Sequence, residues 1–109
     1  MKYIKVLFSN GEIYHIPASI VAHERATYYA NHDIGKQKTD LPSKEWAECF
    51  KKERDYTLGD DFEIIDWANN NMNWEDVEKH AILIDSEAKP INKQKEWVNN
   101  EPEKEIIEK

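Results

Sequence analysis

Two arginines are the first residues in this sequence whose chemistry suggests a binding site. Arg25 and Arg54 are the only arginines among 15 basic residues, and a guanidinium is well suited to hold a phosphate through two parallel hydrogen bonds. Arg25 stands one turn before Tyr28 in a predicted helix. It is either a solvated or ion-paired side chain or a guanidinium held beside aromatic rings, and both arginines are candidate phosphate ligands by elimination.

The second candidate is the segment from Asp60 to Val77, which contains two tryptophans and four asparagines. Asp60, with a glutamate three positions later, has the spacing of a helix start, and three consecutive asparagines predict the end of that helix. Asn73 is then expected to begin a second short helix. The corner is either an ordinary turn anchored by buried tryptophans or a surface that presents Asn71 and Asn73 beside the Trp74 indole, as a planar polar ligand requires.

Residue patterns of catalytic or metal sites are not found. Three glycines, at positions 11, 35 and 59, cannot form a glycine-rich phosphate loop. The pair His23-Glu24 lacks the second histidine of a zinc-protease motif because position 27 is threonine, and the other histidines have no ligand spacing. We therefore expect a binding protein that is not an enzyme and needs no cofactor or metal.

Composition narrows the possible partners further. The chain has 109 residues and a formal net charge of −7, with 34% charged and 39% hydrophobic residues. That charge argues against duplex nucleic acid, whose binding depends on lysine and arginine, and no segment has the length and apolarity of a membrane span or a signal peptide. A single cysteine, Cys49, fits a reducing cytoplasm.

The order of predicted elements indicates an α+β fold in a single domain, residues 1–85. Alternating residues 2–9 and 12–16 flank Asn10-Gly11, which predicts a β-hairpin with a type I′ turn. Helices are expected over 18–33, with alanines at 22, 26 and 30 on one stripe, and over 43–58, after a polar connector at 34–41 and Pro42. The run His80–Asp85 predicts a third strand in the same small antiparallel sheet, which packs against three or four helices.

Residues 86–109 are expected to form a polar, extended C-terminal tail. They include six acids and five lysines, and their apolar residues are sparse. Such a tail is either disordered, because it cannot build its own core, or it docks through Trp97-Val98 and Ile106-Ile107 in a groove of the same or a neighbouring subunit.

Four short stretches resemble a known family. They are Ser9-Asn10-Gly11, Ile16-Pro17-Ala18, Arg25-Ala26-Thr27-Tyr28-Tyr29-Ala30 and the stretch from Asp66 to Trp74. Together they make most of residues 2–85 similar to the first-described Thoeris anti-defence family of phage proteins, which act as sponges for immune signalling nucleotides. The stretch from Lys36 to Arg54 resembles the family pattern least.

The resemblance implies a function without catalysis. Family members are homo-oligomers in the cytoplasm of the infected bacterial host, and they hold cyclic ADP-ribose-type signals in pockets between protomers. Some members also hold cyclic oligonucleotides at a separate site around an assembly axis. On this basis the expected partners of the chain are a nucleotide-derived signalling molecule and further copies of itself.

Several residues acquire hypothetical roles from this picture. An aromatic wall would stack on adenine, Asn73 would read its edge, Arg25 would face phosphate and Asp85 would accept hydrogen bonds from ribose. The full set of candidate ligand-binding residues is Arg25, Tyr28, Arg54, Phe62, Asn71, Asn73, Trp74 and Asp85. The alternative function is a small acidic phage inhibitor that binds a host defence protein directly, which the charge of −7 would suit.

Overall fold

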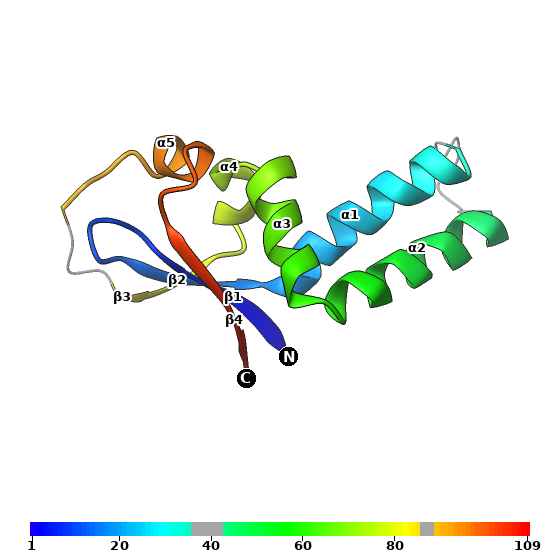
Figure 1. Cartoon of the computed structure of the whole chain (residues 1–109), viewed down its shortest axis with the longest axis horizontal. Coiled ribbons are helices and arrows are strands. Elements are labelled where there is room, and N and C mark those ends of the chain that lie inside the picture. The colour runs from blue at the N-terminus through cyan, green and yellow to red at the C-terminus, as the bar shows by residue number, and fades with distance from the viewer. Residues whose placement is uncertain (36–42, 86–88) are drawn as a thin grey trace.

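The computed structural model describes residues 1–35, 43–85 and 89–109, and within them the fold is α+β as predicted (Figure 1). The described elements are β1 (Lys2–Leu7), β2 (Ile13–Pro17), α1 (Ala18–Asp33), α2 (Lys44–Leu58), α3 (Asp61–Asn71), α4 (Trp74–Glu78), β3 (Ile82–Asp85), α5 (Lys93–Val98) and β4 (Glu103–Glu108). The connector at 34–41 lies mostly outside the described residues, as do Pro42 and residues 86–88.

The four strands form one antiparallel sheet in the order β3-β2-β1-β4. The predicted hairpin and the predicted third strand are both confirmed, but the hairpin turn is not type I′. The Phe8 N–H donates to the Glu12 carbonyl oxygen at 3.0 Å, and within this loop only Gly11 has a positive φ, of 90°. The loop is therefore three residues long with glycine in the left-handed region, which lets Asn10 keep an ordinary backbone.

The expectation of an extended C-terminal tail is wrong, because these residues form α5 and a fourth strand. β4 pairs with β1 along its whole length, with Ile4 opposite Ile106. Trp97 is only 1% exposed and lies in the core of its own chain. A sequence this polar builds no core alone, but strand pairing needs only backbone groups and a single tryptophan supplies a large apolar area.

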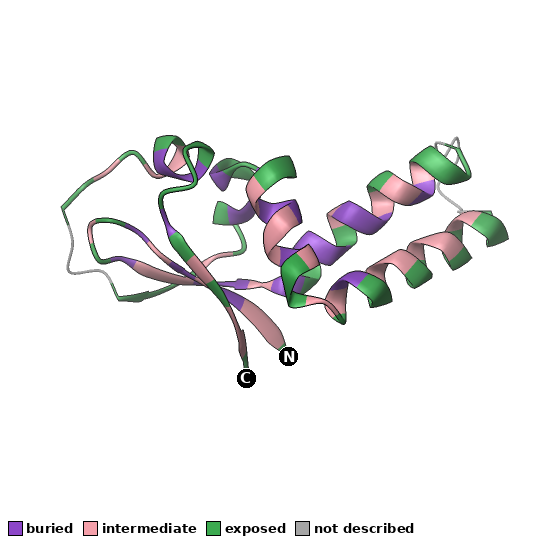
Figure 2. Ribbon diagram, in the orientation of Figure 1, coloured by how far each residue is buried: buried purple, intermediate pink, exposed green. Residues whose placement is uncertain are grey.

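The core lies between the sheet and its helices, and the purple segments in Figure 2 mark the buried residues of both. Ile4 and Val6 of β1 and Ile16 of β2 belong to this core and are fully buried. Helices α3, α4 and α5 lie on one side of the sheet in Figure 1, and α1 and α2 project from its end as a helical hairpin. The predicted tryptophan anchors are confirmed, since Trp67 and Trp74 are both buried in this core.

The helical hairpin depends on the alanine stripe of α1. Ala22, Ala26 and Ala30 are fully buried, and a row of methyl groups lets two helix backbones approach closely. Helix α2 begins where the sequence predicted, with the Ser43 side chain accepting a hydrogen bond from the Trp46 N–H at 3.1 Å. Among the described residues, no helix is long and apolar enough to cross a membrane.

Candidate functional site: two hollows beside α4

The helix, corner and helix predicted from Asp60 onward are present. The Asp60 carboxylate accepts hydrogen bonds from the Phe62 and Glu63 N–H groups at 3.0 and 3.3 Å, as a helix cap does. Helix α3 ends at Asn71, and the Asn73 N–H donates to the Asp76 carboxylate at 2.8 Å to start α4. The corner is thereby fixed by local side-chain contacts.

The corner is also held from the C-terminal segment. The Trp97 indole N–H donates to the carbonyl oxygens of Ala68 at 3.2 Å and Met72 at 2.9 Å. The last carbonyls of a helix have no partner within it, so Trp97 supplies a donor that α3 itself lacks. Its ring also contacts that of Trp74, with centroids 5.9 Å apart. Trp97 thus contacts Ala68 and Trp74, which lie 29 and 23 positions before it in the sequence.

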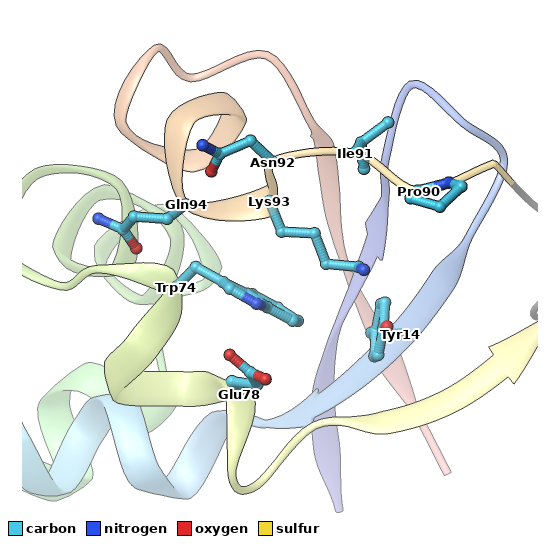
Figure 3. Close-up of a pocket in the computed structure, with 8 residues that line it drawn as sticks. All are labelled: Tyr14, Trp74, Glu78, Pro90, Ile91, Asn92, Lys93 and Gln94. Carbon is cyan, nitrogen blue, oxygen red and sulfur yellow. The ribbon is translucent and has the colours of Figure 1, made fainter.

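The first hollow opens between α4, β2 and the segment that leads into α5. It has a volume of about 610 Å³, within the range of small-molecule sites. We call it the tail hollow, and its lining residues are Tyr14, Trp74, Glu78, Pro90, Ile91, Asn92, Lys93 and Gln94. In Figure 3, Lys93 reaches across the hollow toward Tyr14, and Trp74 and Glu78 lie on the α4 side.

A hydrogen-bonded cluster sets the charge in the tail hollow. The Glu12 carboxylate pairs with the Lys93 ammonium at 3.1 Å and accepts a hydrogen bond from the Tyr14 hydroxyl at 2.8 Å. Burial opposes ionisation of Glu12, but hydrogen bonds from Asn10, Tyr14 and Lys93 outweigh it and hold its pKa below the ordinary value. Burial also raises the pKa of Tyr14. Glu12 and Lys93 are therefore both charged at neutral pH.

The tip of the β-hairpin secures this wall of the hollow. The Asn10 amide donates to the Lys89 carbonyl oxygen at 2.7 Å. The Ser9 hydroxyl and backbone N–H donate to the two oxygens of the Glu96 carboxylate, at 2.6 and 3.2 Å. The segment 89–96 is thus tied to the hairpin at two points, and the lining residues between those points are held in place.

The second hollow lies on the other side of α4, against α1 and α2, and has a volume of about 620 Å³. We call it the histidine hollow, and its lining residues are Ser19, Ile20, His23, Glu24, Phe50, Arg54, Met72, Asp76, Lys79 and His80. Here the Arg54 guanidinium lies 5.7 Å from the centre of the Phe50 ring. The His23 ring meets Phe50 edge to face at 5.2 Å.

Arg25 belongs to neither of these hollows. It is 8% exposed and pairs with Glu53 at 3.1 Å and Glu63 at 3.7 Å. Its guanidinium lies over the rings of Tyr29 and Tyr56, at 4.6 and 5.2 Å. The ion pair and the neighbouring aromatic rings, which the sequence offered as alternatives for Arg25, are therefore both present. A third hollow of about 450 Å³ between α1 and α2 includes Arg25 in its wall.

The eight predicted site residues are therefore spread over the molecule. Trp74 lines the tail hollow, Arg54 lines the histidine hollow, and Arg25 lies between α1 and α2. The other five line none of these three hollows: Tyr28 on α1, Phe62 and Asn71 on α3, Asn73 at the corner and Asp85 at the end of β3. Phe62 is 72% exposed.

Sequence reasoning missed Tyr14, Glu78 and the whole C-terminal lining of the tail hollow, residues 90–94. One local signal was present, because Asn92 accepts a hydrogen bond from the Lys95 N–H and so marks the start of α5. Tyr14 had no such signal, since its position opposite Trp74 depends on how the sheet packs against α4.

Comparisons of the chain with protein-family models, with curated proteins and with solved structures found no match. The resemblance to the anti-defence family accordingly rests on the short stretches of sequence alone.

Proposed function

We propose that this protein binds and sequesters a nucleotide-derived immune signal, a cyclic ADP-ribose isomer or a related cyclic nucleotide, without cleaving it. The observation that carries the proposal is the tail hollow, in which the Tyr14 and Trp74 rings, the Lys93 ammonium and the amides of Asn92 and Gln94 line one space. Aromatic rings stack on bases, an ammonium attracts phosphate, and amides pair with the edges of bases and with hydroxyls.

Each part of the hollow has a role in this proposal. The Tyr14 ring is half-buried and offers a stacking surface, whereas Trp74 is 4% exposed and serves as the fixed wall behind it. Lys93 lies 5.9 Å from the centre of the Tyr14 ring, so a base on Tyr14 would place its phosphate near the ammonium. The Asn-rich corner supports the hollow from behind instead of reading the ligand.

Oligomerisation is part of the proposal, since one edge of the sheet is available for pairing. β3 is an edge strand, and Ile82, Leu83 and Ile84 are 52%, 45% and 49% exposed. An apolar edge strand is a ready template for pairing with another chain. A second copy pairing at β3 would extend the sheet, and light scattering of the purified protein would report a dimer or larger species.

The test is to incubate the native protein with cyclic ADP-ribose isomers and cyclic oligonucleotides, separate it from free ligand, and release what it retains by heating. The expected result is recovery of one signal with unchanged mass. Recovery of a hydrolysed product would replace sequestration with catalysis, and no retention of any of these molecules would overturn the proposal.

A pair of lysines on α5 provides a matched test of the site. Lys93→Gln removes the positive charge in the tail hollow but keeps a donor for Glu12, and calorimetry should show binding weakened by about tenfold. Lys95→Gln makes the same change at an exposed position outside the hollow and should bind as wild type. Equal affinity of the two variants would remove the tail hollow from the site.

The second candidate function is direct inhibition of a host defence protein. The exposed apolar side chains of β3 in a chain of net charge −7 favour it, because a partner with a complementary edge and a basic surface would fit there. A stable complex with a host protein that survives nucleotide removal, formed by a protein that retains no nucleotide, would support this function in place of sequestration.

A further inference from the structure

The histidine hollow contains both basic and acidic side chains, and their surroundings differ. The basic groups are His23, Arg54, Lys79 and His80, and the acidic groups are Glu24 and Asp76. Counted formally, two permanent cations balance two carboxylates, and any protonated histidine adds positive charge. The contacts that these groups already make decide which charge is available to a ligand.

Both carboxylates are already engaged by N–H donors of the protein. The Trp67 indole N–H lies 3.4 Å from the Glu24 carboxylate, and Asp76 accepts a bond from the Asn73 N–H at 2.8 Å. Burial raises the pKa of Glu24, the Trp67 contact lowers it, and the neighbouring Asp76 raises it again. Each carboxylate therefore already has a hydrogen-bond donor within the protein.

The basic groups are less engaged. Within the described ranges, the side chains of Lys79 and His80 have no hydrogen-bond or ion-pair partner. Arg54 forms an ion pair with its neighbour Asp55 at 3.3 Å, and its guanidinium lies 5.7 Å from the centre of the Phe50 ring. An ammonium or imidazole without a partner in the protein can bind an anion without first breaking an internal contact. Lys79 therefore presents an ammonium that an anion can reach without displacing a partner among the described residues.

Apolar side chains complete the lining. Met72 is buried, and Ile20 and Phe50 are half-buried, so part of each faces the hollow. The Phe50 ring is held flat against Trp46, with centroids 5.3 Å apart and planes 7° apart. A ring fixed in this way is an apolar wall that loses little freedom when a ligand packs against it.

We propose that the histidine hollow is a second binding site, separate from the tail hollow, for a small amphipathic anion: a flat apolar ring that carries one phosphate or carboxylate group. The ring packs on Phe50 and Ile20, and the anionic group meets Arg54 and Lys79. This site does not depend on the proposed function, because it shares no lining residue with the tail hollow.

The probe is 8-anilinonaphthalene-1-sulfonate, a fluorescent aromatic anion, with the neutral N-phenyl-1-naphthylamine as its uncharged analogue. The sulfonate should bind one molecule per chain and the neutral analogue about tenfold more weakly. Phenyl phosphate or benzoate should displace the dye, and the stronger competitor identifies the anionic group. Phenol, which lacks the charge, and inorganic phosphate, which lacks the ring, should displace it poorly.

Variants assign the dye to this hollow. Arg54→Gln with Lys79→Gln should weaken dye binding by about tenfold, whereas Lys51→Gln, at an exposed position on α2 outside the hollow, and Lys93→Gln in the tail hollow should leave it unchanged. Far-UV circular dichroism checks that each variant is folded. The proposal is overturned by equal binding of the neutral analogue, by an unaffected double variant, by displacement with phenol or phosphate alone, or by absence of dye binding.

Discussion

Trp97 joins the C-terminal segment to the end of α3, and its replacement by phenylalanine tests how much stability that contact provides. Phenylalanine keeps an aromatic ring in the core but removes the indole N–H that bonds to Ala68 and Met72. Leaving these carbonyl oxygens without a buried donor costs about 1 to 3 kcal/mol. The smaller ring leaves a cavity of roughly 40 Å³, which costs about 1 kcal/mol.

Trp97→Phe should therefore lower the free energy of unfolding by about 2 to 4 kcal/mol. Trp46→Phe is the matched control, because that indole donates to Asn31 at 2.9 Å but is half-exposed, and its loss should cost about 1 kcal/mol or less. Urea unfolding followed by far-UV circular dichroism measures both without relying on tryptophan fluorescence. Equal losses for the two variants would refute the view that Trp97 completes the end of α3.

Three further predictions concern charged residues. Burial lowers the pKa of Lys104 from 10.5 to about 8, so the folded protein holds this proton less tightly than the unfolded chain does. Lys104→Met should therefore stabilise the fold by about 1 kcal/mol at pH 7, after discounting for partial exposure. This gain should shrink between pH 8 and 10.5 in pH-dependent unfolding, and a constant gain would contradict it. Asp60→Ala should cost about 1 kcal/mol in thermal unfolding and Asp60→Asn clearly less, since asparagine also caps helices; equal costs would exclude a capping role. Arg25→Met should lower the free energy of unfolding by about 2 kcal/mol or more, because Glu53 and Glu63 lose their cation. Urea unfolding should show that adding Glu53→Gln and Glu63→Gln to this variant restores stability, whereas no loss in Arg25→Met would mean that the ion pairs contribute nothing.

The outcome for Arg25 bears on how binding data should be interpreted. Its side chain holds α1, α2 and α3 together through Glu53, Thr57 and Glu63. A variant that loses ligand could simply have lost this contact between helices. Stability must therefore be measured before Arg25 is assigned to a ligand, and the same holds for Lys93, because its partner Glu12 is buried.

The alanine stripe, the Asp60 cap and the end of α3 were predictable because each depends on residues within one or two turns of each other. The hairpin was predictable for the same reason, although its turn type was not. Gly11 alone takes the positive φ, and the longer loop leaves the Asn10 side chain free to bond Glu12 and Lys89. The local sequence determines where the turn lies, and the contacts of the residues at its tip determine its geometry.

The candidate site was less predictable, because its lining comes from distant parts of the chain. The tail hollow unites Tyr14, Trp74 and residues 90–94, and the histidine hollow unites Ile20, Phe50 and His80. No spacing in the sequence indicates such a meeting. Arg54 and Trp74 were chosen for the chemistry of their side chains, and the structure places them in separate hollows on opposite sides of α4.

The sequence by itself determined roughly where the helices and strands of residues 1–85 lie, that the fold is α+β, and that the chain is acidic, because these properties follow from short-range periodicity, capping and composition. Tertiary structure decided that the polar C-terminal residues form β4 and bring Trp97 beneath the Asn-rich corner. The physical reason is that strand pairing and indole burial draw their stability from partners up to about a hundred residues away, as Lys2 and Glu108 show. A short stretch of sequence that contains only one partner therefore does not indicate where the other partner lies.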